Sequence, residues 1–232
     1  MFENPKLGIP QPCTADEVYH SLLKSIIKFE LEPGKRISEN QIAQKYKVSR
    51  SVVRTAFTRL QQIKFVEVFP QRGTYISLID LNYISDLLML RTAVEKEVIY
   101  EMFSALKEED RAALVAALEA NLAKQEKCRS EQDYYGKFPR IDSSFHKTMI
   151  DSVGRNALLE LLNDAMLHIA RWRNFDVAFD RRIPELIEQH RAIVDAIKAE
   201  NMLLAQKKMA DHLETISGIA DRAKAKFPSY FI

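Results

Sequence analysis

The sequence predicts a mainly α-helical protein, with a compact helical unit at its N-terminal end and an all-helical bundle of about six helices behind it. Only six of the 232 residues are glycine, and 47% are hydrophobic. Beyond residue 80, apolar residues recur at helical spacing, and no alternating strand pattern interrupts them. The length allows two domains, which we expect at residues 1–79 and 80–232.

Charge is distributed unevenly between these two parts. Residues 1–79 carry 12 Lys and Arg against 7 Asp and Glu, whereas residues 80–232 carry 22 against 25. A basic front part indicates contact with a polyanion. No apolar run approaches the ~18 residues that span a membrane, and the N-terminus lacks a secretion signal. We therefore expect a cytoplasmic protein, in which Cys13 and Cys128 are free thiols that fit no metal or redox spacing.

Capping boxes predict the first two helices. Residues 14–17, TADE, place Thr at the cap and Glu three residues later, and the helix that follows runs to about Phe29. Residues 38–41, SENQ, repeat the pattern with Ser and Gln and open a short helix through about Tyr46.

A third helix is predicted at residues 48–62, VSRSVVRTAFTRLQQ. Ser49 can cap its first amides, and apolar residues at three- and four-residue steps form one stripe. Arg50, Ser51 and Arg54 fall mostly off that stripe and offer groups that meet phosphate oxygens and guanine edges in DNA. An ordinary surface helix with a solvated basic face is the alternative. The very short turn before this helix favours a helix-turn-helix, whose second helix enters the major groove.

Alternating residues after this helix predict a β-hairpin. Residues 65–69 and 74–78 read as its two strands, and Arg72 and Gly73 lie at its tip. A hairpin at this place is a wing, and its tip can bring a cation to the neighbouring minor groove or to phosphate.

Residues 34–76 resemble the winged helix-turn-helix of the GntR family of bacterial transcription regulators. The motifs that carry the resemblance are GKRISE, VSRSVVR and PQRGT. Thr55 departs from the family pattern, which usually has Glu, and Lys64 stands where the family usually has a helix-ending Gly. The resemblance implies DNA contacts by seven residues: Asn40, Ser49, Arg50, Ser51, Arg54, Arg72 and Gly73.

The second part contains six helical segments, which predict a bundle with an inner cavity. The segments lie at about residues 81–105, 108–128, 131–152, 155–175, 182–199 and 201–225.

One carboxylate and three imidazoles can converge in that bundle. Asp142 and His146 are four residues apart and share a helix face, while His190 and His212 lie in the middle of later helices. If these helices face one cavity, the set suits zinc, nickel, iron or manganese. The alternative is that each histidine is a core residue satisfied by a backbone carbonyl.

Most of residues 81–225, including these four residues, resembles the FCD effector domain of the FadR subfamily. Six helices place the domain nearer the VanR branch. The resemblance implies that Asp142, His146, His190 and His212 bind a divalent metal, with zinc expected first. His168 is not at a ligand position of the family, and we expect it in the core.

Two arginines are candidates for binding an effector. Arg91 lies on a strongly apolar helix, where its guanidinium can hold an effector carboxylate or pair internally with Glu95. Arg171 is a weaker candidate, and Trp172 and Arg173 beside it are expected to line the surface.

These features together predict a metabolite-responsive transcription regulator, expected to be a repressor and not an enzyme. A homodimer would bind a pseudo-palindromic operator in double-stranded DNA, and a small carboxylate at the metal would alter its affinity. Two alternatives remain: a metal-dependent, hydrolase-like domain, and a regulator whose metal is purely structural.

Overall fold

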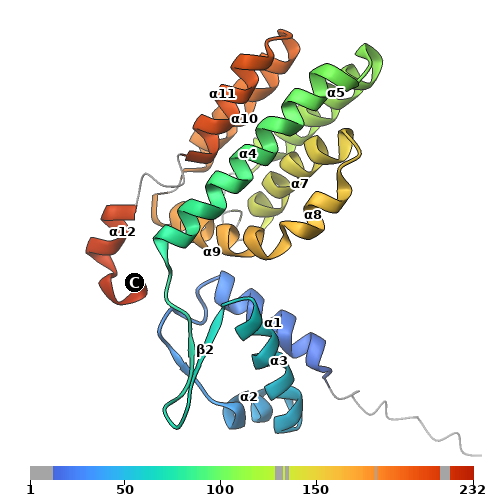
Figure 1. Cartoon of the computed structure of the whole chain (residues 1–232). Helices are drawn as coiled ribbons and strands as arrows, with labels where there is room; N and C mark the ends of the chain where they lie inside the picture. The colour runs from blue at the N-terminus through green and yellow to red at the C-terminus, as the bar shows by residue number, and fades with distance from the viewer. Residues whose placement is uncertain (1–12, 129–132, 134–135, 181, 215–219) are drawn as a thin grey trace, which may run out of the picture. The chain divides into compact units, whose positions relative to one another are not determined.

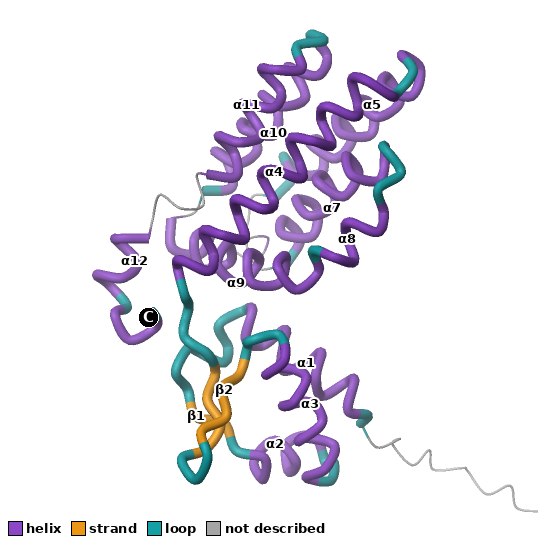
Figure 2. The backbone as a smooth tube through the Cα atoms, viewed as in Figure 1, coloured by secondary structure: helices purple, strands orange, loops and turns teal. Residues whose placement is uncertain are grey.

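The computed structural model describes residues 13–128, 133, 136–180, 182–214 and 220–232, without the side chains of residues 176–180. It confirms a mainly helical chain with one small sheet (Figures 1 and 2). The chain divides into two compact units, Met1–Leu78 and Ile79–Ile232. None of the described helices is long and apolar enough to cross a bilayer.

The described part of the first unit contains three helices: α1 (Ala15–Ile27), α2 (Glu39–Tyr46) and α3 (Arg50–Gln62). The predicted capping box of α1 is confirmed, because the Thr14 hydroxyl accepts from the Glu17 amide and the Glu17 carboxylate accepts from the Thr14 amide. The second predicted capping box is wrong. Ser38 occupies the cap position of α2, but its side chain makes no capping hydrogen bond.

Helix α3 begins and ends as its sequence indicates. Ser49 caps it through the Val52 amide, and the predicted apolar stripe is buried against α1. Lys64, just beyond its end, has a φ of 60°, so a lysine takes the left-handed conformation that glycine adopts more easily. The turn before α3 likewise holds Lys47 in the left-handed region, with a φ of 54°.

The sheet has three antiparallel strands in the order β1-β3-β2. Strands β2 (Val66–Phe69) and β3 (Gly73–Ile76) form the predicted hairpin. Strand β1 (Arg36–Ile37) was not predicted, because two residues are too short to show an alternating pattern. It pairs with β3 and ties the segment before α2 to the wing.

The described residues of the second unit form helices joined by turns and loops, with one isolated β-bridge and no strand. Figure 1 shows α4, α5, α10 and α11 running alongside one another, and apolar side chains of these helices and α7 form its core. The fourth predicted segment is divided into α8 and α9, and the sixth corresponds to α11 and α12, between which residues 215–219 lie outside the described residues. The helices are α4 (Leu81–Ala105), α5 (Glu108–Gln125), α7 (Lys137–Ser152), α8 (Asn156–Leu161), α9 (Asn163–Asp180), α10 (Ile183–Lys198), α11 (Met202–Glu214) and α12 (Ala220–Lys226).

The described part of this unit thus has eight α-helices where the sequence predicted about six. Part of the third predicted segment, residues 131–132 and 134–135, lies outside the described residues. The C-terminal residues return to the start of the unit, where Ile79 and Phe231 form the β-bridge. The Phe231 ring also contacts the Trp172 ring of α9 in a T-shaped arrangement.

Candidate functional sites

The exposed face of α3 carries the cations that the sequence places on a DNA-binding surface. The side chains of Arg50 and Arg54 are 62% and 65% exposed. They stand one helical turn apart and therefore project from the same face of α3. The Ser49 and Ser51 hydroxyls lie beside them and share a hydrogen bond of 2.8 Å.

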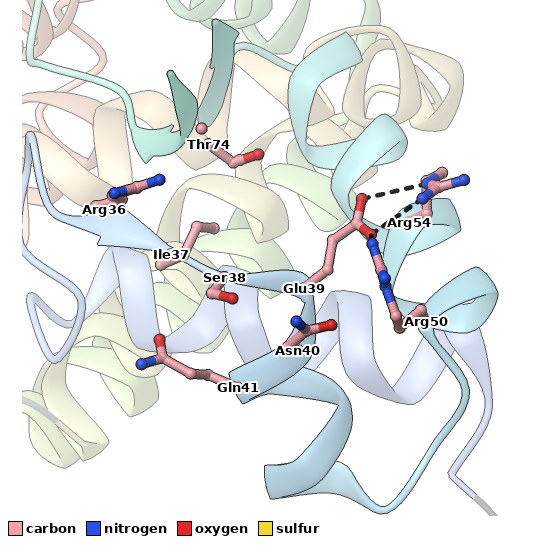
Figure 3. A pocket seen from close by; sticks show the side chains of 10 residues that line it. Arg36, Ile37, Ser38, Glu39, Asn40, Gln41, Arg50, Arg54 and Thr74 are labelled. Atoms are coloured by element: carbon pink, nitrogen blue, oxygen red, sulfur yellow. Dashed lines mark hydrogen bonds and ion pairs between the residues drawn. The ribbon is translucent and has the colours of Figure 1, made fainter. Parts of the chain in front are cut away.

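Glu39, at the start of α2, pairs with both arginines (Figure 3). Arg54 donates through Nε to Oε1 at 3.2 Å and through Nη2 to Oε2 at 3.1 Å. Arg50 donates through Nη2 to Oε2 at 3.2 Å. These hydrogen bonds, first of all that from Arg54, hold the pKa of Glu39 below its usual value. Glu39 was not among the predicted site residues, because these contacts join residues 11 and 15 positions apart.

A hollow of about 620 Å³ between α2, α3 and the wing is lined by some of the predicted DNA-contacting residues. Asn40, Arg50, Arg54 and Gly73 line it, together with Glu39 and Arg36. Ser49, Ser51 and Arg72 are also exposed, but they do not line this hollow.

Gly73 suits the backbone of the wing. Its φ is +115°, a conformation that residues with a Cβ atom rarely adopt. An added Cβ atom would lie 2.7 Å from Arg36 Nε, but Arg36 is an exposed, flexible side chain that can move, so the backbone conformation is what favours glycine. Arg36 was not among the predicted DNA-contacting residues.

The second site is a buried cluster formed by Asp142 and His146 of α7, His190 of α10 and His212 of α11. His190 Nε2 lies 3.1 Å from His212 Nε2, which lies 3.3 Å from His146 Nε2. Asp142 Oδ1 is 3.7 Å from His190 Nε2, and one potential ligand atom from each residue lies within 4.8 Å of the others. The four residues are no more than 3% exposed.

Outer hydrogen bonds determine which nitrogen of each imidazole faces the cluster. His146 Nδ1 lies 2.6 Å from the Glu95 carboxylate, which can only accept when ionised. His190 Nδ1 lies 2.8 Å from Gln125 Oε1. The orientation of that amide is fixed, because Gln125 Nε2 donates to Asn121 Oδ1 and Asn121 Nδ2 donates to the Ile141 carbonyl.

His212 is fixed in a similar way. Its Nδ1 lies 2.9 Å from Gln189 Oε1, while Gln189 Nε2 donates to Glu185. In all three residues Nδ1 therefore carries the hydrogen, and in the neutral ring Nε2 presents its lone pair to the cluster. Burial is the main cause that lowers the pKa of His190 to about 3 and that of His212 well below its ordinary value.

The carboxylate of Asp142 completes this arrangement. Burial alone would raise its pKa, but the Arg173 guanidinium lowers it, so the group is ionised. Arg173 Nη1 pairs with Oδ2, whereas Oδ1 is buried without a hydrogen-bond partner among the described residues. Three inward lone pairs and one carboxylate oxygen repel one another unless a cation lies between them, so the residues fit a divalent metal.

The expectation that Trp172 and Arg173 line the surface is wrong. They are 1% and 5% exposed, and Trp172 stacks on Phe175. Helix α9 buries residues around much of its circumference, so it lacks the one-sided apolar stripe that distinguishes buried from exposed positions.

Arg91 forms the internal pair that was the alternative to effector binding. Its Nε donates to Glu95 Oε1 at 2.6 Å, and both side chains are buried. Arg91 Nη2 nevertheless has no hydrogen-bond partner among the described residues. Arg171 is 3% exposed, and burial lowers its pKa to about 10. His168 is buried beside the Tyr83 ring and does not belong to the cluster.

Two family models match the chain. The model described as bacterial regulatory proteins, gntR family, matches residues 14–76, and the FCD domain model matches residues 86–215. An HTH-type transcriptional regulator in an unstable DNA locus of Streptomyces ambofaciens is 30% identical over 93% of this chain and 88% of its own length. The HTH-type transcriptional repressor RspR of Escherichia coli K12 is 26% identical over 94% of this chain and 92% of its own length.

Solved structures show the same fold at lower sequence identity. A transcriptional regulator GntR from Rhodococcus sp. RHA1 has a TM-score of 0.71 at 22% identity, covering 88% of this chain and 95% of that one. Escherichia coli McbR/YncC has a TM-score of 0.65 at 18% identity, covering 90% of this chain and 97% of that one. The family consists of regulators, so a hydrolase-like activity has no support. The chain belongs to the GntR family of DNA-binding transcription regulators and carries an FCD domain behind its winged helix-turn-helix.

Proposed function

We propose that this regulator is a metal-dependent, metabolite-responsive repressor that acts in the cytoplasm. Asp142, His146, His190 and His212 would hold the metal, and a small carboxylate would bind there as the effector. The observation that carries the proposal is the convergence of three Nε2 lone pairs and the unpartnered Oδ1 of Asp142. Such a centre is costly to bury unless a cation neutralises it.

The donor set favours zinc, with nickel, iron or manganese as the other candidates. Imidazole suits all of these metals, and three imidazoles with one carboxylate leave room for a further ligand in five- or six-coordinate geometry. When bound, the metal supplies a Lewis acid that attracts an anionic ligand. Arg91 supports a carboxylate effector, because its buried Nη2 still has a donor to offer.

The effector can regulate only by binding one arrangement of the protein more tightly than another. A coupling of ~1–3 kcal/mol is typical of allosteric proteins and is enough to change operator occupancy. Two chains would place their α3 helices in successive major grooves of a pseudo-palindromic operator. The similarity to RspR, which is a transcriptional repressor, supports a repressor role.

Arg54→Ala is expected to weaken binding to a preferred duplex by ~1–3 kcal/mol, because a bidentate contact to guanine is lost. Fluorescence anisotropy on a duplex selected by the parent protein measures the change. Lys24→Ala, which removes a cation from α1, serves as the control and should bind within about twofold of the parent. Equal affinity of Arg54→Ala and the parent would contradict a base-reading role.

Gln125→Leu is expected to lower metal affinity by ~10- to 100-fold, because the bond that orients His190 is removed. A competition titration against a chromogenic chelator measures the dissociation constant. Gln206→Leu is the matched control, since Gln206 donates to the Lys96 carbonyl away from the cluster. An unchanged constant for Gln125→Leu would show that the outer bond does not support a metal ligand.

A thermal-shift screen of small carboxylates, with and without chelator, tests the proposal as a whole. A ligand that binds the native state raises the melting temperature by mass action. We expect a stabilising carboxylate whose effect disappears on chelation. If chelation lowers the melting temperature but no carboxylate raises it, the metal is structural, and the effector part of the proposal fails.

A further inference from the structure

Glu39 contacts both candidate base-reading arginines, Arg50 and Arg54. It is the first residue of α2, where the positive end of the helix dipole favours a carboxylate. Its two oxygens accept three hydrogen bonds, two from Arg54 and one from Arg50 (Figure 3). Its side chain is 25% exposed, whereas those of Arg50 and Arg54 are 62% and 65% exposed, so the pairs lie at the surface and salt screens them in part.

The donors that Arg54 uses are those of one edge of its guanidinium. A guanidinium has five N–H donors, and Arg54 gives Glu39 its Nε hydrogen and one Nη2 hydrogen. The adjacent edge, formed by Nη1 and the second Nη2 hydrogen, is not used by Glu39 and can contact guanine O6 and N7 together. Because the Arg54 side chain is 65% exposed, that edge is open for such a contact.

Two consequences for DNA recognition follow from the pairing. A guanidinium held at one edge has fewer conformations, so it loses less entropy when it contacts a base. One carboxylate between two cations also offsets part of their attraction for phosphate, which reduces binding to any duplex irrespective of sequence. Both effects increase discrimination between sequences.

We propose that Glu39 is a positioning residue for base recognition, which orients Arg54 and Arg50 and suppresses sequence-independent binding. The inference rests on the proposed role of these arginines in reading DNA. Glu39 itself contacts no base in this arrangement and acts through the two side chains that it holds.

Glu39→Gln tests the proposal, because the variant keeps the shape of the side chain and removes its charge. The parent first enriches preferred sites from a randomised 30-base-pair duplex library. Anisotropy then gives dissociation constants of parent and variant for one enriched duplex and for a scrambled duplex, at several salt concentrations. We expect the variant to bind the scrambled duplex about twofold to tenfold more tightly at low salt. The dissociation constant for the scrambled duplex divided by that for the enriched duplex should fall about tenfold. Sites selected with the variant should also show a weaker preference for guanine.

Glu67→Gln is the matched control, since it removes an equal charge from an exposed position on β2. It should leave the ratio of the two constants unchanged. Glu39→Asp keeps the charge but shortens the reach, so it should lose discrimination without gaining affinity for the scrambled duplex. Circular dichroism melting verifies that each variant is folded.

Three results would overturn the proposal. An unchanged ratio for Glu39→Gln would show that the pairing does not affect recognition. Equal weakening of the affinity for both duplexes would show that Glu39 has a merely structural role. A loss of base preference confined to cytosine positions of the selected sites would show that Glu39 reads a base itself. A parent protein that enriches no sequence would instead overturn the proposed function, on which this inference depends.

Discussion

His190→Ala is expected to abolish stoichiometric binding of a divalent metal while the chain stays folded. His190 Nε2 is close to both His212 Nε2 and Asp142 Oδ1, so its loss removes the donor that links the others. The effect on metal affinity should exceed the ~10- to 100-fold expected from losing an outer hydrogen bond. Elemental analysis measures the metal content per chain after incubation with a small excess of zinc and dialysis to remove unbound metal.

His168→Ala is the matched control for this substitution. His168 is a buried histidine of the same unit, but it lies outside the cluster. Its replacement should leave the metal content unchanged, whatever it does to stability. Chelator should lower the melting temperature of the parent and of His168→Ala, and leave that of His190→Ala unaffected. Equal metal content in His190→Ala and the parent would rule out the four-residue site.

Periodicity and capping chemistry predicted most of the elements of this fold, because both operate within a few neighbouring residues. The Thr14 box and the apolar stripe of α3 are local features, and the structure has both. The four cluster residues could be selected from their helical spacing and from the resemblance to the FCD domain. Strand β1 could not be predicted, because its two residues form a strand only through their pairing with β3 and show no pattern of their own.

The residues that surround each candidate site were missed for a different physical reason. Gln125 meets His190 across 65 positions of sequence, and Arg173 meets Asp142 across 31. Such contacts depend on how the helices pack, which no local pattern specifies. Glu39 was missed although it belongs to the motif that indicated the family, since its role appears only when α2 and α3 pack together. Candidate ligands are thus easier to predict than the groups that orient them.

Arg173→Ala is expected to destabilise the metal-free second unit by ~3–5 kcal/mol. Arg173 and Asp142 form a buried ion pair, with side chains 6% and 1% exposed, and removing the cation leaves a buried carboxylate without its partner. Urea unfolding followed by the fluorescence of Trp172 measures the loss. Trp172 is the single tryptophan of the chain and lies buried in this unit, so its signal reports the unfolding of the second unit.

Metal should reduce this loss, and the difference distinguishes a metal ligand from a purely structural aspartate. In the proposed site Asp142 Oδ1 contacts the metal while Arg173 holds Oδ2, so a bound cation still neutralises the carboxylate when Arg173 is absent. The loss with saturating zinc should therefore be clearly smaller than the loss with chelator. Arg191→Ala breaks a half-exposed pair with Glu126 and should lose no more than ~1 kcal/mol in either condition. A cation at Asp142 Oδ1 must offset part of the negative charge that is left unpaired when Arg173 is removed. If Arg173→Ala loses the same free energy of unfolding with zinc as with chelator, Asp142 therefore does not contact the metal.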